Sequence, residues 1–134
     1  PIGTAEVKRE GEDVSLIAHG RCVIVALEAA KKLEEESGIK AEVVDLRSIR
    51  PLDEDTILKS VAKTNRVVLV DESKPFCGIS SQIATLIQEK AFDDLDAPVK
   101  RVTSIDAPAI YSPPVEKEQI PNVSRIVDMV QSLG

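Results

Sequence analysis

Hydrophobic residues follow two patterns, which take turns along the 134-residue chain. Some form short unbroken runs, such as Val67 to Val70, which are typical of strands buried on both faces of a sheet. Others recur at helical spacing, as between residues 21 and 37, and predict helices with one buried face. The predicted strands are residues 5–9, 14–18, 43–46, 66–71 and 99–103, and the predicted helices are residues 21–37, 54–63, 79–92 and 121–133. Because strands and helices alternate, we expect one α/β domain, residues 1–134, with a mostly parallel sheet and helices on both faces.

The segment from residue 40 to residue 57 carries the clearest local signals. After its predicted strand, Pro51 ends extended structure, because proline has no amide hydrogen and restricts the residue before it. Asp53 stands at a helix start, where its carboxylate can accept hydrogen bonds from backbone amides of the first turn. Glu54 and Asp55 follow, where negative charge meets the positive end of the helix dipole. The segment therefore predicts a strand, a polar corner and a helix.

The composition narrows the classes of function. Aromatic residues make up only 2% of the chain, so the core must consist of Val, Ile, Leu and Ala, which suits a parallel sheet covered by helices. A net charge of −6 and the lack of a basic run argue against nucleic-acid binding. No apolar run approaches the length of a membrane span. Cys22 and Cys77 are isolated from each other, which indicates a reducing compartment such as the cytoplasm rather than a disulfide framework.

No catalytic motif is recognisable in the sequence. There is no glycine-rich phosphate-binding loop and no nucleophile elbow, and the two cysteines lack metal-ligand spacing. The single histidine, His19, follows a predicted strand at its carboxyl end, where open α/β sheets bind ligands, but no nucleophile accompanies it. Asp71 and Glu72 also follow a strand, where aspartate more often closes a turn. We therefore expect no catalytic, cofactor-binding or metal-binding residue in this chain, and we expect the cysteines to be small buried side chains.

One acidic run differs from the other charged stretches. Asp93, Asp94 and Asp96 lie within four positions, flanked by Phe92 and Leu95, in a connection that a proline ends. Composition alone favours a solvated loop. Three neighbouring carboxylates repel one another, however, and a partner with opposite charge would relieve that repulsion.

A family resemblance extends over essentially the whole chain. Six segments carry it in order: PIGTAEVKREGEDV, ALEAAKKL, VDLRSIRPLD, VVLVDE, KAFDDLDAPVKRV and DAPAIYSPPVEK. Together they resemble the C-terminal domain of transketolase-like thiamine diphosphate enzymes, most closely the beta subunit of pyruvate dehydrogenase and related 2-oxo acid dehydrogenases. The resemblance implies a three-layer α/β/α fold with a five-stranded, mostly parallel but mixed sheet.

The resemblance also implies a function without catalysis in this segment. In the family, thiamine diphosphate and magnesium lie between two other domains, and the parent enzyme decarboxylates a 2-oxo acid and acylates lipoamide. The implied roles of this domain are pairing with the alpha subunit and a second beta subunit, and docking of the small, basic subunit-binding domain of the dihydrolipoyl acyltransferase. The implied docking residues are Asp93, Asp94, Asp96 and the chain end at Gly134. The isolated domain is expected to be inactive, and the parent to lie in the cytoplasm or, in a eukaryote, in the mitochondrial matrix or plastid.

Two other kinds of protein are also compatible with the sequence. One is the matching domain of a transketolase-type enzyme. The other is a separate α/β module that binds a small ligand at the carboxyl ends of its strands, near His19 and Asp71. Because the chain begins with Pro1 rather than methionine, we expect a piece of a longer protein.

Overall fold

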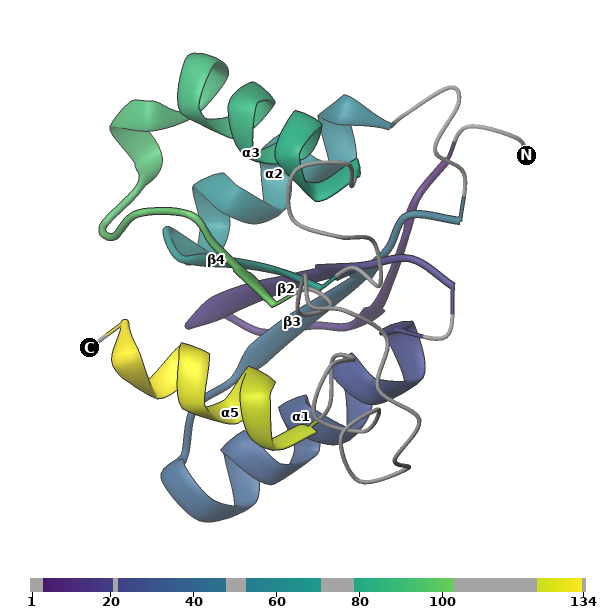
Figure 1. The fold of residues 1–134 in the computed structure, drawn as a ribbon, viewed down its shortest axis with the longest axis vertical. Coiled ribbons are helices and arrows are strands. Elements are labelled where there is room, and N and C mark those ends of the chain that lie inside the picture. Colours follow the sequence, from purple (N-terminus) through teal and green to yellow (C-terminus); the bar gives the residue numbers. More distant parts are fainter. Residues whose placement is uncertain (1–3, 21, 48–52, 71–78, 103–122, 134) are drawn as a thin grey trace, which may run out of the picture.

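The computed structural model describes residues 4–20, 22–47, 53–70, 79–102 and 123–133 (Figure 1). The strands are β1 (Glu6–Arg9), β2 (Val14–Ala18), β3 (Ala41–Asp45), β4 (Val67–Val70) and β5 (Lys100–Val102). The helices are α1 (Cys22–Ser37), α2 (Glu54–Thr64), α3 (Ile79–Lys90), the short 3-10 helix η1 (Phe92–Asp94) and α5 (Val123–Ser132). The predicted α/β class is confirmed. The third helix was predicted too long, because Ala91 leaves helical geometry with φ −131° and ψ 18°, and the chain then tightens into η1.

The sheet has five strands in the order β1-β3-β2-β4-β5. β2 pairs in parallel with both β3 and β4, and β4 pairs in parallel with β5. β1 is antiparallel to β3, with an irregular register between Val7 and Arg9. The sheet is therefore mixed and mostly parallel, as the resemblance implied.

Helices cover both faces of this sheet, with α1 and α5 on one side and α2 and α3 on the other (Figure 1). Successive residues of β2 point to opposite faces, so Leu16 belongs to one core and Ile17 to the other. We name these the α1/α5 core and the α2/α3 core. Principal members of the α1/α5 core are Leu16, Leu33, Val43, Val68 and Ile126. Principal members of the α2/α3 core are Ile17, Val44, Ile57, Leu69 and Ile87. Within the described ranges, no helix is long and apolar enough to cross a membrane.

The predicted cap of α2 is confirmed. The carboxylate of Asp53 accepts hydrogen bonds from the backbone amide of Thr56 at 3.1 Å and from its hydroxyl at 2.6 Å. It also accepts from the backbone amide of Ala5 at 2.9 Å, which ties the chain entering β1 to the start of α2. The hydrogen bond from the Thr56 side chain, with the two backbone bonds, lowers the pKa of Asp53 below its usual 3.8.

Replacing Asp53 with alanine is expected to lower the free energy of unfolding by about 1 kcal/mol at neutral pH, the usual effect of losing a helix cap. Because the pKa of Asp53 is lowered in the folded state, its contribution is complete above pH 3.8 and is lost as the pH falls through the folded value. Urea denaturation of the parent and the variant at pH 6 and pH 3 tests this, with Asp53→Asn as the control that keeps an acceptor oxygen. A difference between parent and alanine variant that is equal at both pH values would contradict it.

Candidate partner-binding surface

The acidic loop, residues 92–96, connects α3 to the segment that leads into β5. Asp93, Asp94 and Asp96 are all exposed. Leu95 is partly buried and packs against the α2/α3 core, whereas Phe92 is 66% exposed. Of the two apolar residues beside the acids, only Leu95 therefore contributes to the core, and Phe92 is left on the surface with the carboxylates.

Asn65 holds the acidic loop against the end of α2. Its side-chain amide donates to the backbone oxygen of Asp94 at 2.6 Å, and its backbone oxygen accepts from the amide of Asp96 at 2.8 Å. Asn65 is the residue that ends α2, with a left-handed φ of 64°, which asparagine tolerates better than most residues. Asn65 was not predicted from the sequence, although an asparagine between a helical pattern and a buried strand is a recognisable helix end.

Two hollows flank the acidic loop. The first, about 490 Å³, is lined by Phe92, Asp93, Leu95 and Asp96 together with Gln88 and the residues that follow the loop. The second, about 630 Å³, is lined by residues from the ends of α1, α2 and α5 and by Glu12, Asp13, Arg66 and Asp96. Asp96 lies on both. Three helix carboxyl ends add partial negative charge to the three acids of the second hollow, which outnumber its one cation, Arg66, so the formal charge of its lining is negative.

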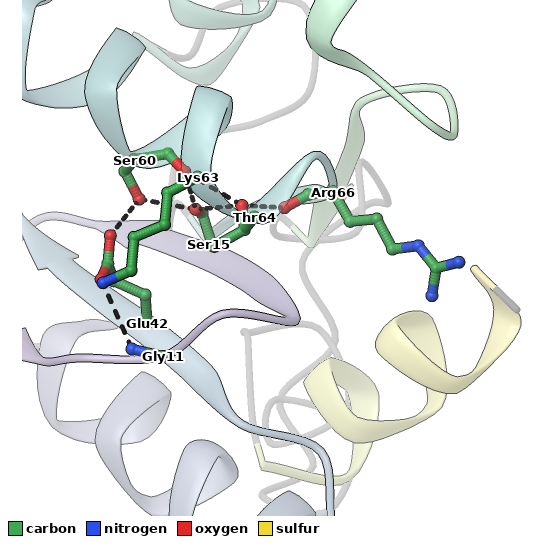
Figure 2. Close-up of polar contacts among 7 residues, drawn as sticks. All are labelled: Gly11, Ser15, Glu42, Ser60, Lys63, Thr64 and Arg66. Carbon is green, nitrogen blue, oxygen red and sulfur yellow. Dashed lines mark hydrogen bonds and ion pairs between the residues drawn. The ribbon is translucent and has the colours of Figure 1, made fainter.

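A buried polar network lies beside this edge (Figure 2). Glu42, on β3, is only 3% exposed, and its carboxylate accepts hydrogen bonds from the Ser60 hydroxyl and the Lys63 ammonium, both at 2.7 Å. The Ser15 hydroxyl contacts the hydroxyls of Ser60 at 2.6 Å and Thr64 at 2.7 Å. In Figure 2 the side chain of Arg66 extends away from the network toward the yellow ribbon of α5.

This network joins α2 to the sheet and has no catalytic geometry. The hydrogen bond from Lys63 to Glu42 raises the pKa of the lysine above its usual 10.5, so the amine stays protonated and is a poor nucleophile. Glu42 also accepts a long hydrogen bond, 3.4 Å, from the backbone amide of Gly11. This network was not predicted from the sequence; the available signal was a glutamate directly before the apolar pair Val43 and Val44.

Of the other predicted candidates, His19 and Cys22 lie in the described part of the chain. His19 is half-buried directly after β2, and in the described part of the chain its buried Nδ1 has no hydrogen-bond partner. Cys22 is buried, with 2% of its surface exposed, as expected of a small apolar side chain. Asp71, Glu72, Cys77 and Gly134 lie outside the described residues. Among the residues that are described, no three acidic, histidine or cysteine side chains form a group suited to a metal.

The structure is an α/β domain with a mixed, mostly parallel sheet of five strands. Comparison with known proteins identifies its family. The family model named "Transketolase, C-terminal domain" matches residues 3–126. The chain belongs to this family, which confirms the resemblance.

Individual relatives are beta subunits. The chain is 49% identical over 133 residues to the beta subunit of acetoin:2,6-dichlorophenolindophenol oxidoreductase from Bacillus subtilis, covering 99% of this chain and 39% of that protein. It is 48% identical over 127 residues to the mitochondrial pyruvate dehydrogenase E1 component subunit beta-2 of Oryza sativa subsp. japonica, covering 95% of this chain and 34% of that protein. A solved structure described as a split gene transketolase, inactive beta4 tetramer, superposes with a TM-score of 0.86 at 32% identity, covering 98% of this chain and 42% of that one. The chain thus spans less than half the length of these relatives.

Proposed function

We propose that this chain is the C-terminal domain of the beta subunit of a thiamine diphosphate-dependent 2-oxo acid dehydrogenase of the pyruvate type. The parent enzyme decarboxylates a 2-oxo acid and passes the acyl group to lipoamide. Identity of 49% and 48% to two beta subunits, along nearly the whole chain, supports this assignment. The bacterial and mitochondrial sources of these relatives fit a location in the cytoplasm or the mitochondrial matrix.

The role of the domain is to hold partners. It contributes to pairing with the alpha subunit and a second beta subunit, and it docks the basic subunit-binding domain of the dihydrolipoyl acyltransferase. The observation that supports the docking role is the acidic loop, where three exposed carboxylates follow an exposed Phe92 within four positions. Aromatic side chains are enriched in protein interfaces, and complementary charge accelerates encounter. Asp93, Asp94 and Asp96 are the docking residues of this proposal, with the chain end at Gly134.

Thiamine diphosphate and magnesium bind elsewhere in the parent enzyme under this proposal. The residues that the structure describes do not fit them. The sequence has no glycine-rich loop to cradle a pyrophosphate, and the described residues offer no cluster of metal ligands. The isolated domain is accordingly expected to be inactive.

Changing Asp93, Asp94 and Asp96 together to asparagine is expected to slow association with the acyltransferase's subunit-binding domain about ten-fold at low salt and to flatten the salt dependence. The fold is retained, because the three side chains are exposed. Stopped-flow association rates of the full-length protein, with and without the three substitutions, are measured against ionic strength to test the proposal.

A charge-matched control separates local docking from net charge. The control variant also loses three negative charges, but from exposed positions on β1, α1 and α2. Its substitutions are Glu6→Gln, Glu28→Gln and Asp55→Asn. This control is expected to slow association far less. Rates and salt slopes of the loop variant that equal those of the parent would refute the docking role.

A transketolase-type parent is the second candidate, and the split gene transketolase structure favours it at a TM-score of 0.86. The assay that distinguishes the two is the reaction of the full-length protein with its partner subunit. Decarboxylation of a 2-oxo acid supports the first proposal, and transfer of a two-carbon ketol group between sugars supports the second.

A further inference from the structure

We propose that Asn65 is the positioning residue of the docking surface, an inference that rests on the proposed docking function. Asn65 contacts no partner itself under this proposal. It sets the conformation in which the acidic loop presents its carboxylates.

Asn65 makes two hydrogen bonds to the acidic loop, one on either side of Leu95. The Asn65 side-chain amide holds the backbone oxygen of Asp94, and the Asn65 backbone oxygen holds the backbone amide of Asp96. Leu95 lies between these two anchored groups. Its backbone is extended, with φ −86° and ψ 131°, and its side chain packs into the α2/α3 core.

These two hydrogen bonds determine where the carboxylates of the acidic loop point. In an extended segment, neighbouring side chains lie on opposite sides. Asp94 ends η1, and the extended backbone at Leu95 then turns the side chain of Asp96 to the side opposite Leu95; Asp94 and Asp96 are both exposed. Three carboxylates in four positions repel one another, so an untethered loop would spread them over many conformations. A partner would then have to order the loop on binding, which lowers affinity.

The residue type suits this task. The position has a left-handed φ of 64°, which asparagine and glycine adopt at little cost. Glycine has no side chain to donate a hydrogen bond, and aspartate in place of asparagine would present a carboxylate to the Asp94 oxygen. Asparagine satisfies both the backbone conformation and the bond of 2.6 Å.

The test compares Asn65→Asp with Gln131→Glu in the full-length protein. Each change adds one negative charge near Asp96, since Gln131 lines the same hollow as Asn65 and Asp96. If charge alone governs docking, both variants associate faster with the acyltransferase's basic subunit-binding domain. If Asn65 positions the loop, Asn65→Asp dissociates about ten-fold faster, whereas Gln131→Glu does not, because Gln131 donates to Ser37 rather than to the acidic loop.

A second measurement separates this inference from the docking proposal. Hydrogen exchange at the Asp96 amide is expected to accelerate at least several-fold in Asn65→Asp and to remain at the parent rate in the triple asparagine variant. Asn65→Gly is expected to keep the salt slope of association, because its charges are unchanged, while raising the dissociation rate.

Unchanged exchange, or dissociation of Asn65→Asp at the parent rate, overturns the role of Asn65. If the triple variant binds normally while exchange still accelerates in Asn65→Asp, the docking function has failed, and the positioning role falls with it.

Discussion

Replacing Gly11 with alanine is expected to lower the free energy of unfolding by about 3 kcal/mol, the upper part of the usual range for forcing atoms into a packed region. Gly11 is buried in the turn between β1 and β2. A Cβ atom there would lie 2.5 Å from the carbonyl carbon of Ala41, 2.7 Å from its oxygen and 2.6 Å from the oxygen of Lys40. These are backbone atoms, so no side chain can rotate away.

The turn is also held against the start of β3, which limits its freedom to move. Asp13 donates its backbone amide to the Lys40 oxygen at 2.9 Å, and its carboxylate accepts from the Lys40 amide at 2.7 Å. Shifting Gly11 would lengthen its bond to Glu42 as well. The added methyl group is therefore accommodated only by disturbing the first residues of β3.

Gly38→Ala is the matched control for this substitution. Gly38 has a φ of +67°, and a Cβ there would meet no atom within 4 Å, so only the strained backbone conformation costs free energy, about 1–2 kcal/mol. Urea unfolding of both variants gives the comparison. A loss for Gly11→Ala that does not exceed the loss for Gly38→Ala would contradict the predicted overlap.

Truncating either of two neighbouring residues of β2 is expected to produce the largest loss of stability, about 2–5 kcal/mol each for Leu16→Ala and Ile17→Ala. Leu16 is 0% exposed in the α1/α5 core, and Ile17 is 2% exposed in the α2/α3 core. Because the two residues lie on opposite faces of the sheet, each cavity opens under a different pair of helices.

Hydrogen exchange identifies which helices loosen. Leu16→Ala is expected to accelerate exchange mainly in α1 and α5, and Ile17→Ala mainly in α2 and α3. Ile24→Ala is the control, since Ile24 is 62% exposed and its truncation should change stability by less than about 0.5 kcal/mol. Equal loosening of all helices in both core variants would mean that the two cores do not respond separately.

The local elements of this fold were predictable because their signals lie within a few residues. Four successive apolar residues predicted β4, and all four are buried. The cap at Asp53 was predicted from its place before a helical pattern, and its hydrogen bonds to Thr56 confirm it. Element ends were less predictable: α3 ends at Lys90, although apolar residues continue beyond it.

Local sequence patterns could not predict the long-range contacts. No local signal distinguishes β1 as antiparallel, because its direction depends on pairing with β3, more than thirty residues along the chain. Phe92 and Leu95 are both apolar neighbours of the acids, and only the contact with the α2/α3 core separates the buried one from the exposed one.

Part of the candidate partner-binding surface was predictable from the sequence, and part of it was not. Asp93, Asp94 and Asp96 were identified from their density in the sequence, and the structure places all three on the surface. Their docking role stays a prediction, and Gly134 lies outside the described residues. Asn65 was recognisable as a helix end, but its contact with the acidic loop was not predictable from local patterns, because those hydrogen bonds span about 30 positions of the chain.

The irregular pairing of β1 limits how this domain can recruit other chains. In the described sheet β1 is an outer strand, and the open side of such a strand can add a strand from another molecule and start aggregation. β1 has only four residues, three of them charged, and its register shifts between Val7 and Arg9. Short length, charge and irregularity all disfavour an added strand. A partner is therefore not expected to extend the sheet at β1, and the opposite outer strand of the described sheet, β5, offers only three residues for such pairing.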